Sequence, residues 1–104
     1  MDATKFSSNL KRLLGIHDLT YREAAKLTNM SYQAYTSWAQ GGRTPSFKTA
    51  LVIGEFFGVP ANRLAEANFE DLLEHELSDP ERYRQVEARI KKARSRLQLV
   101  REGR

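Results

Sequence analysis

The segment from Leu19 to Pro45, LTYREAAKLTNMSYQAYTSWAQGGRTP, constrains the fold more than any other part of the chain. Thr20 and Ser31 stand where two short helices would begin, and the hydroxyl of either residue can cap a helix N-terminus. Asn29 lies between them, and Asn is the non-glycine residue that best tolerates a left-handed backbone conformation. The order of caps and turn therefore predicts two short helices that meet at a tight turn.

Small and aromatic side chains in this segment predict how the two helices pack. Ala24 and Ala25 are small enough to let the helices cross closely, and Met30, Tyr35 and Trp38 follow at spacings of five and three. We expect these last three side chains to face the interior. The first helix should cover about residues 21–28 and the second about 32–40.

Three further helices are predicted around this pair. The first covers about residues 4–14 and stops at Gly15, the next begins near Ser46 and ends at Gly58, and a short one follows Pro60. Their apolar positions should join the two aromatic residues in one core that is complete before the C-terminal part begins: Phe6, Leu10, Leu13, Leu14, Phe47, Leu51, Val52, Phe56, Phe57 and Leu64. No strand pattern is present.

The sequence resembles the Cro- and lambda-repressor-like helix-turn-helix proteins of the xenobiotic-response-element type. The matching features are REAAKLTNMS, the pair Tyr35 and Trp38, GGRTPS and the helical run ending FFGVP, within about residues 6–64. Asn29 replaces the usual Gly, and Ala39-Gln40 stands where a Glu commonly precedes the loop. The resemblance implies a five-helix DNA-binding domain.

The second helix of the motif is the expected reading element. Tyr32, Gln33 and Thr36 lie opposite the inward aromatic residues, near the helix end that enters the major groove in this motif. Gln33 can form two hydrogen bonds to the N6/N7 edge of adenine. The resemblance adds backbone phosphate contacts from the start of the first helix and from the loop after the second. The full expected DNA-binding set is Thr20, Tyr21, Ser31, Tyr32, Gln33, Thr36, Ser37, Gln40 and Arg43, to which Lys48 at the start of the next helix is added.

Charge divides the chain into three parts. Residues 1–63 carry eight Lys/Arg against four acids, residues 64–77 carry five acids and no base, and residues 78–104 carry nine Lys/Arg against four acids. A basic domain, an acidic segment and a basic tail are thus expected. We place the boundary between a DNA-binding domain, residues 1–66, and a C-terminal helical region, residues 67–104.

The C-terminal region predicts two helices, Asn68-capped residues 69–77 and residues 80–101. The second carries apolar residues at spacings 3-4-3-4-3, a heptad seam typical of helix pairing. Because a parallel pair would set Arg89 against Arg94, we expect the acidic helix to pack on the basic one as a hairpin, and two hairpins to close a dimer. The expected dimerisation residues are Phe69, Leu72, Leu73, Tyr83, Val86, Ile90 and Leu97.

Other classes of function receive little support. His17 and His75 lack a helical partner for metal binding, no Gly-rich phosphate loop or catalytic triad is recognisable, and no cofactor or metal is expected. The absence of Cys favours the cytoplasm, and no apolar run approaches the roughly 18 residues of a membrane span. A net charge of +4 suits a polyanionic partner.

The sequence thus predicts a non-enzymatic, sequence-specific regulator of transcription. It should bind double-stranded DNA through the major groove as a homodimer, as a repressor of the phage-immunity or the chromosomal kind. Two alternatives stay open: the antitoxin of a toxin–antitoxin pair, whose last helix holds a protein partner, and a protein-interaction adaptor that does not bind DNA.

Overall fold

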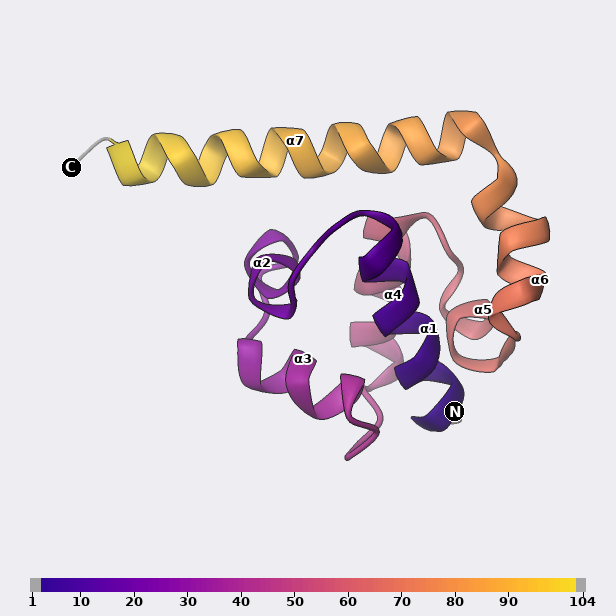
Figure 1. Cartoon of the computed structure of the whole chain (residues 1–104). Helices are drawn as coiled ribbons and strands as arrows, with labels where there is room; N and C mark the ends of the chain where they lie inside the picture. Colours follow the sequence, from indigo (N-terminus) through magenta and orange to yellow (C-terminus); the bar gives the residue numbers. More distant parts are fainter. Residues whose placement is uncertain (1–2, 103–104) are drawn as a thin grey trace.

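The computed structural model describes the backbone of residues 3–102 and the side chains of residues 4–97. All regular structure in this part is helical, which confirms the all-α class and the helix-turn-helix with additional C-terminal helices (Figure 1). The elements are α1 (Ala3–Ile16), α2 (Tyr21–Leu27), α3 (Tyr32–Ala39), α4 (Phe47–Phe57), α5 (Ala61–Glu66), α6 (Phe69–Glu74), the 3-10 turn η1 (Glu76–Ser78) and α7 (Pro80–Glu102).

Two helix ends differ from the expectation. α1 continues through Gly15 to Ile16, and the left-handed turn falls on Asp18, whose φ is 54°. α6 ends at Glu74 instead of residue 77, and its N-cap Asn68 makes no side-chain capping bond. By contrast, the predicted end of α4 is confirmed, because Gly58 takes a left-handed φ of 75°.

The core gathers around α1, with Phe6, Leu10, Tyr35, Phe57 and Leu64 fully or almost fully buried. α4 and α5 approach closely at Gly54. A Cβ atom there would lie 2.3 Å from the carbonyl oxygen of Val59, so no larger residue fits without a backbone shift.

α4 turns a different face inward from the one the sequence predicts. Ala50, Ile53 and Phe57 are buried, whereas the exposed fractions of Phe47, Leu51 and Val52 are 60%, 40% and 42%. The expectation that these last three join the core is therefore wrong. Since α4 is apolar on nearly every side, its periodicity does not reveal which side faces the core.

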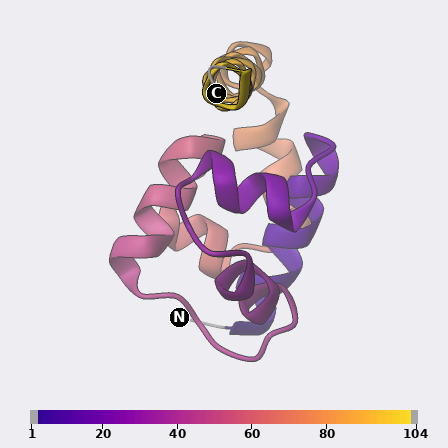
Figure 2. The same ribbon diagram turned by 90° about the vertical axis from the view of Figure 1, so that its left-hand side faces the viewer.

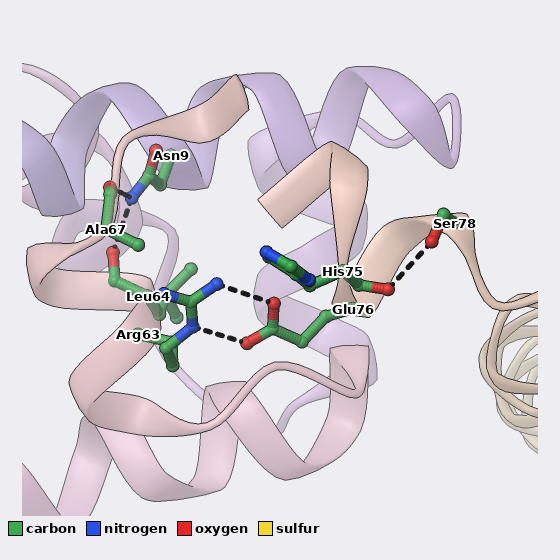
Figure 3. A network of polar contacts seen from close by, with 7 residues as sticks. All are labelled: Asn9, Arg63, Leu64, Ala67, His75, Glu76 and Ser78. Atoms are coloured by element: carbon green, nitrogen blue, oxygen red, sulfur yellow. Dashed lines mark hydrogen bonds and ion pairs between the residues drawn. The ribbon is translucent and has the colours of Figure 1, made fainter. Parts of the chain in front are cut away.

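Buried polar groups join the C-terminal part of the fold to α1 and α5 (Figure 3). Asn9 Nδ2 donates to the carbonyl oxygens of Leu64 and Ala67, at 2.8 and 2.9 Å. Arg63 Nε and Nη2 donate to the two carboxylate oxygens of Glu76, at 2.8 and 3.0 Å. This paired hydrogen bond, above all, lowers the pKa of Glu76 below its usual range.

α7 lies across the five-helix domain as a long straight helix and is seen nearly end-on in Figure 2. It packs on α2, α4 and η1, and only 1% of Val86 and 2% of Ile90 remain exposed. The core is therefore not complete without the C-terminal part. Both residues belong to the same buried cluster as Phe57 and Val59, so the core extends across the expected boundary at residues 66 and 67.

Polar side chains of α7 reach the turn after α1 and the C-terminal end of α4. Glu87 Oε2 lies 2.6 Å from Nδ1 of the buried His17, whose ring stacks on Tyr83 with a centroid distance of 5.2 Å. Arg89 Nη1 donates to the carbonyl oxygens of residues 55 and 56 at the C-terminal end of α4, both at 3.1 Å.

The expected hairpin of α6 and α7 does not form. α6 packs on α1 and η1, and Glu70 of α6 pairs with Arg12 of α1 at 3.4 Å. Glu70 thus pairs with an arginine of the five-helix domain instead of one of α7. The charge pattern correctly indicated that α6 would pair with arginine side chains. It could not show whether these arginines belong to α7 or to α1.

Candidate nucleic-acid interface

The corner between α2 and α3 is built by local hydrogen bonds. Thr20 Oγ1 accepts from the backbone N–H of Glu23 at 3.1 Å, and Glu23 Oε1 accepts from the backbone N–H of Thr20 at 3.4 Å. Ser31 Oγ accepts from the N–H of Ala34 at 3.0 Å, and Asn29 has a φ of 58°. Both predicted caps and the predicted turn are present, and they fix the angle between the two helices.

The inner face of α3 is held by its aromatic residues. Tyr35 is fully buried and Trp38 almost so, and their ring centroids lie 5.4 Å apart. The Tyr35 hydroxyl lies 2.7 Å from Thr28 Oγ1, which itself donates to the carbonyl oxygen of Ala24. Burial raises the pKa of Tyr35 to about 12, so it stays neutral at physiological pH. The inward orientation predicted for both aromatic side chains is confirmed.

The outer face of α3 presents side chains to solvent at its N-terminal end. Tyr32 and Gln33 are exposed, whereas Thr36 and Ser37 are half-buried. Thr36 Oγ1 already donates to the carbonyl oxygen of Tyr32 at 2.9 Å, which leaves its methyl group and its acceptor lone pairs for a partner. The side-chain amide of Gln33 is therefore exposed at this end of α3 and available to a binding partner.

One exposed cation beside this face was missed by the sequence analysis. The Arg22 guanidinium of α2 lies 4.3 Å from the centre of the Tyr32 ring. A cation stacked on an aromatic ring holds both side chains in place. The signal was available, because Arg22 lies in the first turn of α2, but adjacency to Tyr32 required the crossing angle of the helices.

The remaining predicted contacts lie at the ends of the same two helices. Thr20 is exposed and Tyr21 half-buried at the start of α2, while Gln40 and Arg43 are exposed in the loop that follows α3. Gly41 in this loop has a left-handed φ of 74°, and the N–H of Gly42 donates to the Ser37 carbonyl oxygen at 2.9 Å. The hydroxyls of Thr20 and Ser31 are engaged as caps. The predicted set thus spans the start of α2, the outer face of α3 and the loop after α3.

The predicted dimerisation residues do not form one exposed surface. Phe69, Leu72, Val86 and Ile90 are buried within the chain's own core, so they are not free to meet a second subunit in this arrangement. Leu73, Tyr83 and Leu97 are exposed, but they lie apart on α6 and α7. A heptad seam indicates that a helix packs on another apolar surface. For α7 that surface is the core of the same chain.

Two other kinds of site are absent from the described part of the chain. No group of three or more His, Asp or Glu residues there is arranged to hold a metal ion. No helix within residues 3–102 is both long enough and apolar enough to cross a membrane.

Comparison with known proteins connects this geometry to a family. The helix-turn-helix family model matches residues 10–64, which include α2, α3 and α4 completely. A similar protein is the uncharacterized HTH-type transcriptional regulator YqaE of Bacillus subtilis (strain 168). It is 32% identical over 83 residues, covering 75% of this chain and 72% of YqaE. No solved structure matches the chain. The chain belongs to the Cro/C1-type helix-turn-helix family.

Proposed function

We propose that the protein is a transcriptional repressor that binds operator DNA through α3, acts in the cytoplasm and has no enzymatic activity. Family membership and the printed name of YqaE support a DNA-binding regulator. The repressor role rests on the narrower resemblance to repressors of this type. The observation that carries the proposal is the outward, unobstructed N-terminal end of α3, where Tyr32 and Gln33 are exposed.

The chemistry of this end suits base-edge recognition. An exposed Gln amide presents one donor and one acceptor, which match the N7 and N6 positions of adenine in the major groove. Tyr32, held by Arg22, can add an apolar contact to a thymine methyl group, and Arg43 can neutralise a phosphate. α7 runs along the opposite side of the molecule from α3, so it leaves this end open (Figure 1).

Selection of binding sequences from random duplex DNA tests base readout. Gln33→Ala should weaken binding to the selected sequence by about 1–3 kcal/mol and relax the preference at one or two base positions. Gln85→Ala is the matched control, because Gln85 is also exposed but lies on α7. An unchanged selected sequence for Gln33→Ala would show that α3 does not lie in the groove as proposed.

Salt dependence separates phosphate contacts from base contacts. Arg43→Ala should weaken binding to all sequences alike and reduce the slope of log affinity against log salt by about one unit. An adaptor would show no binding to random duplex DNA at low salt. An antitoxin would bind DNA but would also hold a toxin, which co-purification with proteins encoded beside it would reveal.

The operator form is proposed to be a homodimer. Two copies would place one α3 in each of two half-sites about 34–36 Å apart, or a multiple of that distance, on one face of the duplex. The exposed Tyr83 and Leu97 of α7 are the remaining candidates from the predicted seam. A selected sequence with two inverted half-sites supports this form, and a single half-site contradicts it.

A further inference from the structure

α4 carries an apolar surface that no other described part of the chain covers. Phe47, Leu51 and Val52 keep 60%, 40% and 42% of their surface exposed, although all three lie on one helix within two turns. Three large apolar residues grouped in this way are a feature of association surfaces, whereas scattered ones need no explanation. α4 lies along one edge of the molecule, the pink helix at the left of Figure 2.

Two opposite charges lie along the middle of this surface. At about 100° per residue, Lys48 and Glu55 fall on the same line of the helix, two turns apart, with Leu51 on one side of that line and Val52 on the other. Both charged residues are exposed. Neither side chain forms a hydrogen bond or ion pair with another residue of the described chain, and Arg89 donates to the backbone carbonyl of Glu55 rather than to its carboxylate.

The spacing makes this surface complementary to itself. A twofold axis that passes between Leu51 and Val52, perpendicular to α4, places residue 48 opposite residue 55 and residue 55 opposite residue 48. We propose that two copies of this chain pair through antiparallel α4 helices. Each Lys48 faces the partner's Glu55, and Leu51 and Val52 meet their own copies at the axis.

An isologous contact of this kind requires one patch that fits itself, which is the property that α4 displays. A parallel α4 pair would instead set Lys48 near Lys48 and Glu55 near Glu55, which is unfavourable. Charge therefore selects the antiparallel arrangement. Because the patch is small, the pair belongs to the weak class of interfaces that bury less than about 1,200 Å².

The antiparallel arrangement determines where the two reading helices point. α4 begins after the loop that follows α3 and ends beneath Arg89 of α7, so it runs from the α3 side of the molecule toward the α7 side (Figure 1). Reversing α4 in the partner reverses this direction. The two α3 helices then face opposite sides of the pair, and the pair can hold two separate DNA segments.

This bridging differs from the operator dimer, whose α3 helices must face the same side of one duplex. Two operator-bound units joined through α4 would hold distant sites together. Only the bridging step rests on the proposed DNA-binding function, because the pairing itself needs no DNA.

Sedimentation equilibrium of the full chain without DNA tests the pairing. Leu51→Ser should weaken self-association about tenfold or more, since it removes an apolar side chain at the axis from both copies. Leu73→Ser is the matched control, with an exposed fraction of 42% against 40% for Leu51, and Leu97→Ser tests the alternative pairing through α7. A loss that follows Leu97 and not Leu51 would overturn the proposal in favour of pairing through α7.

Charge reversal tests the register of the pair. Lys48→Glu and Glu55→Lys should each weaken association about fivefold or more, because each creates two like-charged contacts per pair. The double variant restores both contacts with the signs exchanged and should recover most of the wild-type association. Failure of the double variant to recover would exclude the antiparallel register, provided that circular dichroism shows all variants folded.

Bridging is measured by capture of a labelled duplex on a second, immobilised duplex. Wild-type protein should capture it, whereas Leu51→Ser should lose at least about nine-tenths of the capture while it still binds a single duplex, because separate operator-bound units remain intact. If Gln33→Ala lost binding to a single duplex but kept wild-type self-association in sedimentation, DNA binding through α3 and pairing through α4 would be separate activities. Unchanged capture by Leu51→Ser would refute bridging through α4.

Discussion

The α2–α3 corner and the helix α7 are held in opposite ways. The corner is stabilised by partners close in sequence: Thr20 with Glu23, Ser31 with residue 34, and Thr28 with Tyr35. α7 is held by partners far away in sequence, namely His17 for Glu87 and the end of α4 for Arg89. The comparison teaches that local bonds define the shape of the motif, while distant ones place the long helix.

The largest effect is expected inside the corner. Trp38→Ala should lower the free energy of unfolding by about 3–5 kcal/mol, because removal of a buried indole leaves a large cavity. Chemical denaturation followed by circular dichroism measures the change. In the wild type, blue-shifted Trp38 emission that is protected from quenchers should accompany burial, and an emission typical of water would contradict it.

The next effect tests whether α7 belongs to the core. Ile90→Ala should lower the free energy of unfolding by about 2–4 kcal/mol, independently of protein concentration, because Ile90 packs within one chain. Leu97→Ala serves as the control and should change stability by less than about 0.5 kcal/mol, since Leu97 is exposed on the same helix. If the loss of stability caused by Ile90→Ala depended on protein concentration, Ile90 would lie in a subunit interface instead.

The smallest expected effect is a pH-dependent loss of stability at the bond between Arg63 and Glu76. The pKa of Glu76 is lowered below its usual value of 4.5, so its bond with Arg63 stabilises the fold fully above that pH. This stability is lost as pH falls through the lowered pKa of the folded state. Glu76→Gln should cost about 1–2 kcal/mol at neutral pH and much less in acid, with the exposed Glu74→Gln as control.

Hydrogen exchange can localise the acid effect. Amides of residues 69–78 should lose protection at a higher pH than those of α3, because the inner face of α3 is held by the neutral Tyr35. Equal loss in both regions would show that the Arg63–Glu76 bond stabilises the whole fold and not the C-terminal part alone.

Sequence reasoning succeeded where structure follows from neighbouring residues. Caps at Thr20 and Ser31, the turn at Asn29 and the stop at Gly58 were all predictable, because each depends on the intrinsic preference of one residue. Gly15 was misread, since α1 continues through it and the left-handed turn falls on Asp18. A preference indicates where a helix can stop, and tertiary contacts decide whether it does.

Prediction failed where an apolar surface could pack on more than one partner. The apolar seam of α7 was read correctly as a packing surface, but its spacing does not distinguish a second subunit from the chain's own core. The same ambiguity left Leu51 and Val52 in the expected core of α4. Of the candidate DNA contacts, the outward position of Gln33 followed from helix periodicity, whereas the place of Arg22 required the fold.

The carboxylate of Glu23 joins the two regions with its two oxygens. Oε1 accepts from the Thr20 N–H, and Oε2 accepts from Arg94 of α7 at 3.1 Å. A Glu23→Gln variant keeps an oxygen for the cap but removes the charge that attracts Arg94. The start of the DNA-binding motif and the attachment of the C-terminal helix are therefore genetically separable, so selection can alter one without first dismantling the other.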